Sequence, residues 1–211
     1  MNQSEERQDN IQRVIETALD MFMENGVAAT SMSQVAKKVN LSQMSLYRYF
    51  GNKEEFILRI WKYALTEFYR YFYEKYPGDG EFKTGYERFV ACMGAYYSLY
   101  EEFPNWYKYT HEMFTYRFKR DENADCKIAN VFWNHYGKEI PLPALKALKD
   151  GVEDGSIRKD INIYAIYQIL LNAYTGTTLY ENISFGFSPE DTVRITASLI
   201  SKYIKNDQPV C

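Results

Sequence analysis

Hydroxyl and cationic side chains gather between Ser31 and Lys53, a stretch that contains no aspartate or glutamate. Its charged residues are Lys37, Lys38, Arg48 and Lys53, whereas the whole chain of 211 residues carries a formal net charge of −3. Side chains of these types donate hydrogen bonds to anions, so the chemistry open to them is phosphate binding. A local basic face on an acidic protein is compatible with DNA binding.

Capping signals divide this stretch into two short helices. Ser31 followed by Gln34 fits a capping box and predicts a helix that stops at Asn40, a residue that tolerates the left-handed conformation of a tight turn. Ser42 is the expected N-cap of a second helix over residues 43–49. Two short helices joined by a tight turn are typical of a helix-turn-helix motif.

Longer helices are predicted on both sides of the motif. Apolar residues at helical spacing predict a helix over 8–25, with Gly26 as its C-terminal cap. After Asn52, a long apolar stripe continues to Pro77, so one helix joins the motif to the rest of the chain. The positions assigned to a small three-helix core are Val35, Ala36, Val39, Leu41, Leu46 and Phe50.

The second short helix is the candidate recognition helix, whose first residues are expected to face base edges in a major groove. Gln43 has the chemistry to pair with adenine, and Arg48 with guanine or a phosphate. Hydroxyl groups and helix starts suit phosphate oxygens, a role assigned to Ser31, Ser45, Tyr47, Tyr49 and Lys53. Capping alone would also explain Ser31, and core packing would explain Tyr49.

The remaining sequence is predicted to be helical as well, without a strand or an internal repeat, and residues around 124–136 are placed in a helix. The expected fold is therefore all-α. A helix-turn-helix domain is expected over 1–53, and a helical domain over 54–211. The small and apolar faces of 162–183 and 189–204 suit close helix packing between two copies of the chain.

Aromatic and methionine side chains in the second domain are candidates for lining a small-molecule pocket. They are Met93, Tyr97, Tyr109, Met113, Phe114 and Phe132. For any one of them, ordinary core packing is the favoured alternative. An apolar, aromatic or cationic ligand would suit such a lining.

Few residues point to catalysis or to a metal. The three cysteines are widely spaced and form no CxxC or Cys/His cluster, so we expect no metal, cofactor or catalytic residue. An enzyme with a site built from Cys92, His111 and His135 stays an alternative. The N-terminus is polar, and no apolar run approaches the ~18–20 residues that span a bilayer, so we expect a cytoplasmic protein.

The run from Gly26 to Phe56 resembles the DNA-binding domain of the tetracycline-repressor (TetR) family of bacterial regulators. The residues that carry the resemblance are Gly26, Thr30, Ser31, Val35, Ala36, Leu41, Ser42, Leu46, Tyr47, Tyr49, Phe50, Lys53, Glu54 and Phe56. The resemblance implies a homodimeric transcriptional repressor that binds palindromic double-stranded operator DNA. It also implies a small-molecule effector site in the C-terminal domain, whose occupation releases the DNA.

Three positions depart from the common pattern of the family. Asn40 stands where glycine is usual, and Arg48 where histidine is frequent. Met44 stands where glycine or alanine is usual, at the start of the candidate recognition helix. Its long side chain could contact a thymine methyl group, so Met44 joins the candidate DNA contacts. A regulator without any small-molecule effector stays an alternative.

Overall fold

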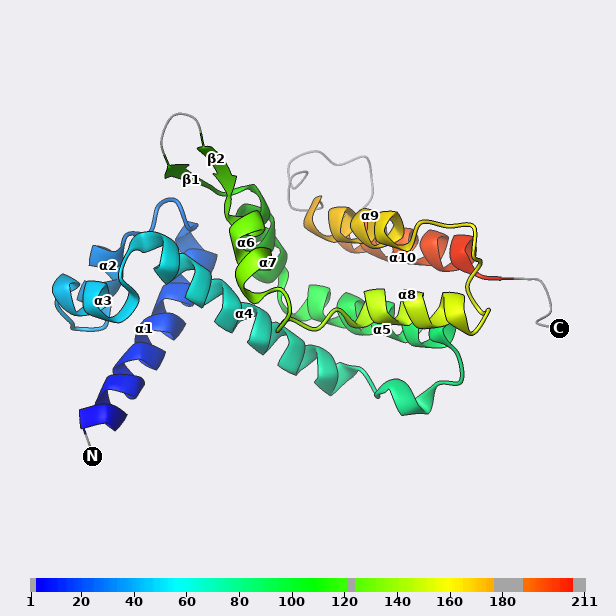
Figure 1. The fold of residues 1–211 in the computed structure, drawn as a ribbon, viewed down its shortest axis with the longest axis horizontal. Coiled ribbons are helices and arrows are strands. Elements are labelled where there is room, and N and C mark those ends of the chain that lie inside the picture. The colour runs from blue at the N-terminus through cyan, green and yellow to red at the C-terminus, as the bar shows by residue number, and fades with distance from the viewer. Residues whose placement is uncertain (1–2, 121–123, 177–187, 207–211) are drawn as a thin grey trace. The chain divides into compact units, whose positions relative to one another are not determined.

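The computed structural model describes residues 3–120, 124–176 and 188–206, which are almost entirely helical (Figure 1). This confirms the all-α fold class. In chain order, the helices among the described residues are α1 (Gln3–Asn25), α2 (Met32–Lys38), α3 (Gln43–Phe50), α4 (Lys53–Lys75), α5 (Gly85–Glu102), α6 (Pro104–Thr115), α7 (Ile128–Tyr136), α8 (Pro143–Glu153), α9 (Ile163–Gly176) and α10 (Pro189–Ile204). A short 3-10 turn, η1 (Asp79–Glu81), follows α4.

A small antiparallel ribbon is the exception to the helical pattern. It consists of β1 (Arg117–Arg120) and β2 (Ala124–Lys127), with Arg117 paired to Lys127. The expectation of no strand, and of a helix across 124–136, is wrong at this point. The apolar stripe that indicated that helix starts only at Ile128, where α7 begins, because the residues before it are mostly charged or polar.

The chain divides by packing into two units, each described by itself. The first comprises residues Met1–Phe68 and Lys108–Ile140, so it joins the N-terminal helices to α6, α7 and the ribbon. The second comprises Tyr69–Tyr107 and Pro141–Cys211. The expected functional boundary after residue 53 stays a prediction. None of the helices in the described ranges has the length and apolar character needed to cross a membrane.

Capping bonds confirm the local signals of the helix-turn-helix segment. The Ser31 hydroxyl accepts the N–H of Gln34 at 3.2 Å, and the Gln34 side chain accepts the N–H of Ser31 at 2.7 Å. Asn40 takes the left-handed conformation, with φ of 60°. The Ser42 hydroxyl accepts the N–H of Ser45 at 3.1 Å, so α2 and α3 begin where predicted.

Phe56 of α4 lies at the centre of the core that these helices share. Its ring centroid is 5.0 Å from that of Phe50 in α3 and 6.1 Å from that of Phe22 in α1. Leu46 is also fully buried, whereas Leu41, likewise assigned to the core, is half-buried. The aromatic contacts fix the face of α3 that points inward.

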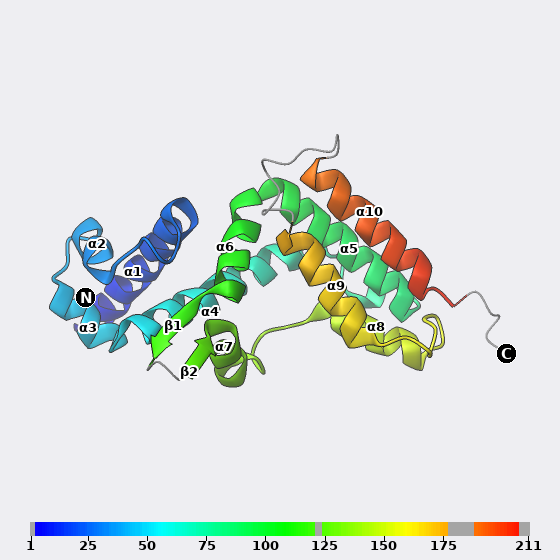
Figure 2. The same ribbon diagram turned by 90° about the horizontal axis from the view of Figure 1, so that it is seen from above.

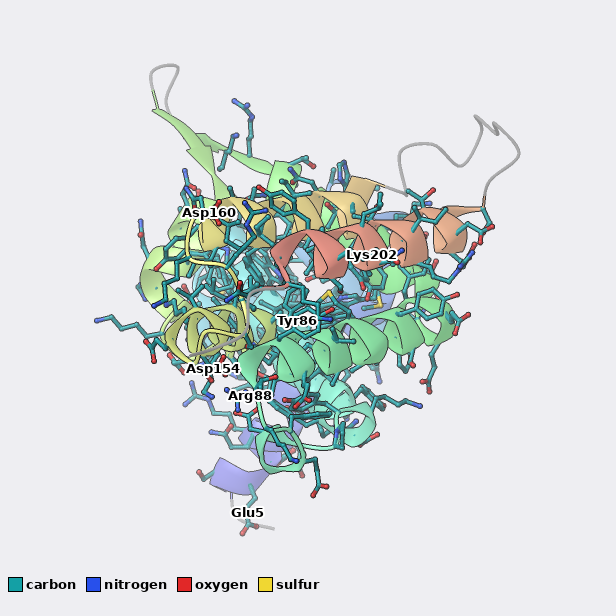
Figure 3. All side chains as sticks on the ribbon, turned by 90° about the vertical axis from the view of Figure 1, so that its right-hand side faces the viewer. Glu5, Tyr86, Arg88, Asp154, Asp160 and Lys202 are labelled. Carbon is teal, nitrogen blue, oxygen red and sulfur yellow. The ribbon has the colours of Figure 1, made fainter. Side chains whose placement is uncertain are left out.

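In the second unit, α5, α8, α9 and α10 pack against one another (Figure 2). Arg88 of α5 bonds to Asp150 of α8 at 3.1 Å, and the Gly85 N–H donates to Asp154 at 2.6 Å. Figure 3 shows the start of α5 and the end of α8, where Tyr86, Arg88 and Asp154 are labelled.

Apolar side chains stay exposed on α9 and α10. The most exposed are Leu199 at 62%, Tyr164 at 61% and Tyr203 at 54%, followed by Ile169 and Ile195. Within 162–183, one of the two segments predicted to dimerise, residues 177–183 lie outside the described residues. These side chains lie on the two helices predicted to pack between two copies of the chain, and the homodimer stays a prediction.

Candidate nucleic-acid interface

Helix α3 presents a polar and partly apolar face to solvent. Leu46 and Phe50 are 0% and 2% exposed and hold its other face to the core. Met44 is 77% exposed and Tyr47 is 43% exposed, and Arg48 is also exposed. The packing of α3 therefore turns the predicted reading residues outward, while its two buried residues fix its orientation.

The remaining predicted contacts differ in exposure. Gln43, the first residue of α3, is exposed, whereas Ser45 is half-buried and its hydroxyl lies 2.9 Å from that of Ser42. Tyr49 is half-buried, and its ring centroid lies 6.5 Å from that of Phe50 in an edge-to-face arrangement. Tyr49 thus takes part in packing, the alternative role considered for it, while part of its side chain still reaches solvent.

Ser31 and Lys53 lie at the starts of α2 and α4, and both are half-buried. The two lysines in the last turn of α2 are exposed. The nearest acids that follow in the chain are Glu54 and Glu55, and Glu55 is occupied by an ion pair with Arg59 at 3.0 Å. The surface of α2 and α3 is therefore free of carboxylates, as a phosphate-facing surface requires.

A tie between α6 and the N-terminal helices could not be predicted from the sequence. One carboxylate oxygen of Glu112 in α6 accepts the backbone N–H groups of Val27 at 2.8 Å and Ala28 at 3.1 Å. These residues form the turn between α1 and α2, where Gly26 has φ of 85°. The partners are 84 and 85 residues apart in sequence, so no local pattern could have indicated the bond.

Replacing Glu112 by alanine is expected to lower the free energy of unfolding by about 1–3 kcal/mol, because it leaves the Val27 N–H without its acceptor. Val27 is fully buried, so water cannot substitute well. Glu112→Gln is the matched control, because it keeps a carbonyl acceptor and should lose less. Chemical denaturation measures both changes, and hydrogen exchange at the Val27 and Ala28 amides reports on the turn. Equal stability of all three proteins would contradict the tie.

The six predicted effector residues fall into the two packing units. Met93 and Tyr97 belong to the second unit, and the other four to the first. In the first unit, Trp61 of α4 contacts two of the predicted effector residues and forms an aromatic cluster with them. Its ring centroid is 4.2 Å from that of Phe132 and 5.8 Å from that of Phe114. Trp61 carried no signal that separated it from ordinary core residues in the sequence.

Two buried polar atoms accompany this aromatic cluster. The indole Nε1 of Trp61 and the hydroxyl of Thr110 have no hydrogen-bond partner among the described residues. Thr110 lies one turn before Phe114 on α6. Buried polar groups without partners are costly, and a ligand that bonds to them would remove that cost.

The alternative catalytic set would use Cys92 as its nucleophile. Burial raises the pKa of the Cys92 thiol to about 12, so the thiol stays protonated at neutral pH and is a poor nucleophile. Among the described residues, no group of three or more His, Cys, Asp or Glu could hold a metal ion.

An open groove of about 640 Å³ lies on the second unit, lined by residues from Glu81 to Ala91 that include Phe82, Tyr86 and Val90. None of the predicted effector residues lines it.

Comparison with known proteins finds that residues 14–60 match the family model of bacterial regulatory proteins of the tetR family. The HTH-type transcriptional regulator AcrR of Shigella flexneri is 28% identical over 78 residues, which are 36% of this chain and 36% of that protein. The matched segment thus spans about a third of the length of that curated relative.

Solved structures share the fold over nearly the whole chain. The transcriptional regulator FadR from Bacillus subtilis, in complex with stearoyl-CoA, has a TM-score of 0.66 at 18% identity and covers 92% of this chain and 99% of its own. A putative regulator from Saccharomonospora viridis, in complex with choline, also has a TM-score of 0.66, at 15% identity, over 97% and 100% of the two chains. Residues 14–60 therefore carry the N-terminal sequence pattern of the tetR family of bacterial regulatory proteins, and the whole chain shares the fold of these solved structures.

Proposed function

We propose that the protein is a DNA-binding transcriptional regulator that reads a palindromic operator with α3. The observation that carries the proposal is the solvent-exposed face of α3. Leu46 and Phe50 are buried and fix the orientation of this face, and neither α2 nor α3 contains a carboxylate. An α-helix fits the major groove of B-form DNA, and its exposed side chains then reach base edges.

The roles of the side chains follow from their chemistry and exposure. Gln43 would pair with adenine, and Arg48 with guanine or a phosphate. Met44 is an apolar side chain held in water, and contact with a thymine methyl group would remove it from solvent. Phosphate contacts, which set the position of the helix without reading sequence, are assigned to Ser31, Ser45, Tyr47, Tyr49 and Lys53.

Arg48→Ala is expected to weaken operator binding by roughly tenfold to a hundredfold, because it removes a charged contact worth about 1–3 kcal/mol. Tyr47→Phe removes a single hydroxyl contact, so a loss of only a few-fold is expected. Fluorescence anisotropy with labelled duplexes measures both, and sedimentation shows whether the oligomer stays intact. If neither change alters the affinity, α3 is not the recognition helix.

A homodimer formed through α9 and α10 completes the proposal. Their exposed apolar side chains would be buried between two copies, which gives a free-energy reason for association. Two copies also place two recognition helices in successive major grooves, about 34–36 Å apart. A cytoplasmic location follows from the proposed action on DNA.

Control by a small molecule is proposed for the aromatic cluster around Trp61. The unpaired Nε1 of Trp61 suits a ligand with a hydrogen-bond acceptor. Tyr109 of α6, another predicted effector residue, stacks on Phe22 of α1 with 6.5 Å between the ring centroids, which would connect the ligand site to the N-terminal helices. Such a ligand would release operator DNA only if it binds the DNA-free state more tightly. Acyl-CoA and choline are the first compounds to test, because two proteins of the same fold are described in complex with stearoyl-CoA and with choline.

The experiment measures operator affinity at increasing concentrations of stearoyl-CoA or choline. A ligand that lowers the affinity identifies the effector class. If a broader screen also leaves the affinity unchanged, the protein is a regulator without a small-molecule effector.

A further inference from the structure

We propose that Arg7, near the start of α1, is a further DNA-binding residue that contacts a backbone phosphate from a site it shares with Arg48 and Tyr49. The inference rests on the proposed function and extends the DNA-binding surface beyond α2–α4, the elements that contain the predicted contacts.

The Tyr49 ring brings the two arginines together. The guanidinium carbon of Arg7 lies 5.8 Å from the centroid of the Tyr49 ring, and that of Arg48 lies 5.6 Å from the same centroid. Both distances are within the range of cation–π attraction. Helix α1 therefore places a cation beside the end of α3, although the two arginines are 41 residues apart in sequence.

The ring is a fixed platform. Tyr49 is half-buried and meets the edge of Phe50, and Phe50 in turn contacts Phe56 at 5.0 Å. Phe50 and Phe56 are 2% and 1% exposed, so the ring that Tyr49 contacts is itself held in the core. The arginines, by contrast, are both exposed, so their guanidinium groups are open to a ligand.

No carboxylate of the described residues neutralises this pair of cations. Neither Arg7 nor Arg48 forms an ion pair with a described residue. The positions three and four residues from Arg7 on α1 hold Gln3, Ser4, Asn10 and Ile11, none of them acidic. The nearby acids Glu5, Glu6 and Asp9 project from other sides of the helix, about 100° or more away.

Two exposed guanidinium groups near one aromatic ring make this part of the surface positively charged. A backbone phosphate of duplex DNA suits such a surface, and the proposed docking of α3 would bring Arg7 close to the DNA. The Tyr49 hydroxyl, already assigned to a phosphate, would be a third donor at the same place. Arg7 is thus a sequence-independent contact, whereas Arg48 serves as base reader or phosphate contact.

The test measures the affinity of the full-length protein for two DNA duplexes at a series of KCl concentrations. One duplex is the promoter of the protein's own gene, and the other is a scrambled duplex of the same composition. Arg7→Gln is expected to lower the affinity roughly three- to tenfold for both duplexes and to reduce the slope of log K against log salt by about 1. Arg7→Lys keeps the charge and should keep most of the slope.

Arg70→Gln is the matched control. Arg70 also lies over a tyrosine ring, at 4.1 Å from the centroid of Tyr71, and removing it changes the net charge by the same amount. Arg70 is paired with Glu74 at 2.7 Å and lies outside the first unit, which contains the predicted DNA contacts. The slope of log K against log salt for Arg70→Gln should therefore equal that of the native protein.

A double-mutant cycle then tests whether the Tyr49 ring positions Arg7. In a Tyr49→Leu background, Arg7→Gln should have a smaller effect than in the native protein, because the ring no longer positions the guanidinium. If Arg7→Gln leaves both slope and affinity unchanged while Arg48→Ala weakens binding, this inference is wrong and the proposed function stands. If the native protein binds neither duplex in a salt-dependent way, both fail.

Discussion

Leu199→Glu is expected to separate the proposed homodimer and, with it, to remove high-affinity operator binding. Leu199 is the most exposed large apolar side chain of α10, and Ile195 and Tyr203 lie one turn before and after it on the same helix face. A carboxylate at the centre of an apolar interface loses its hydration without gaining a partner. We expect a loss of about 3 kcal/mol of dimerisation free energy, or roughly a hundredfold in the dissociation constant.

The effect on DNA follows from geometry. A dimer engages two half-sites with one binding event, whereas a monomer has only a single recognition helix. The measurement pairs analytical ultracentrifugation with anisotropy titrations of the operator. Ser198→Glu is the matched control, because Ser198 is exposed but points about 100° away from Leu199 around the helix. A Leu199→Glu protein that stays dimeric would show that α10 does not form the interface.

Gly85→Ala is expected to destabilise the second unit by about 3 kcal/mol. A Cβ atom at Gly85 would lie 2.1 Å from the backbone nitrogen of Gly151 and 2.7 Å from the carbonyl oxygen of Ala147. Both are backbone atoms of α8, which cannot rotate away as a side chain would. Helices α5 and α8 would have to separate, and the bond from the Gly85 N–H to Asp154 would stretch.

Differential scanning calorimetry of the full chain tests this expectation. For a protein of this length, 3 kcal/mol corresponds to a fall in Tm of roughly 6–12 °C. Gly94→Ala is the matched control on the same helix, because no atom lies within 4 Å of its added Cβ. That change should stabilise the helix by about 0.5–1 kcal/mol. An unchanged Tm for Gly85→Ala would contradict the close approach of α5 and α8.

Local signals carried most of what could be predicted about the N-terminal helices. The capping pairs of Ser31 and Ser42 and the left-handed Asn40 depend on neighbours within a few residues, so the sequence itself contains them. Burial of Leu46 and Phe50 follows from their spacing on one face of α3. The exposure of Met44 and Arg48 then follows from that same assignment.

Contacts between distant segments could not be predicted in this way. The Glu112 bonds to the turn after α1 and the approach of Arg7 to Tyr49 depend on how helices pack, which helical periodicity does not specify. For the same reason, the six effector candidates shared a composition but fell into two packing units. Trp61, which contacts Phe114 and Phe132 of the larger group, could not be told from a core residue in the sequence.

The central claim, that the dimer reads DNA with α3, is tested most directly by selection of binding sites from a random duplex library with the native protein and with an Arg48→Ala variant. The account predicts that the native protein enriches a palindrome whose half-site centres are one helical turn or a multiple of it apart, and that the variant binds this palindrome more weakly. Enrichment of no duplex by the native protein, or of the same palindrome with the same affinity by both proteins, would contradict it.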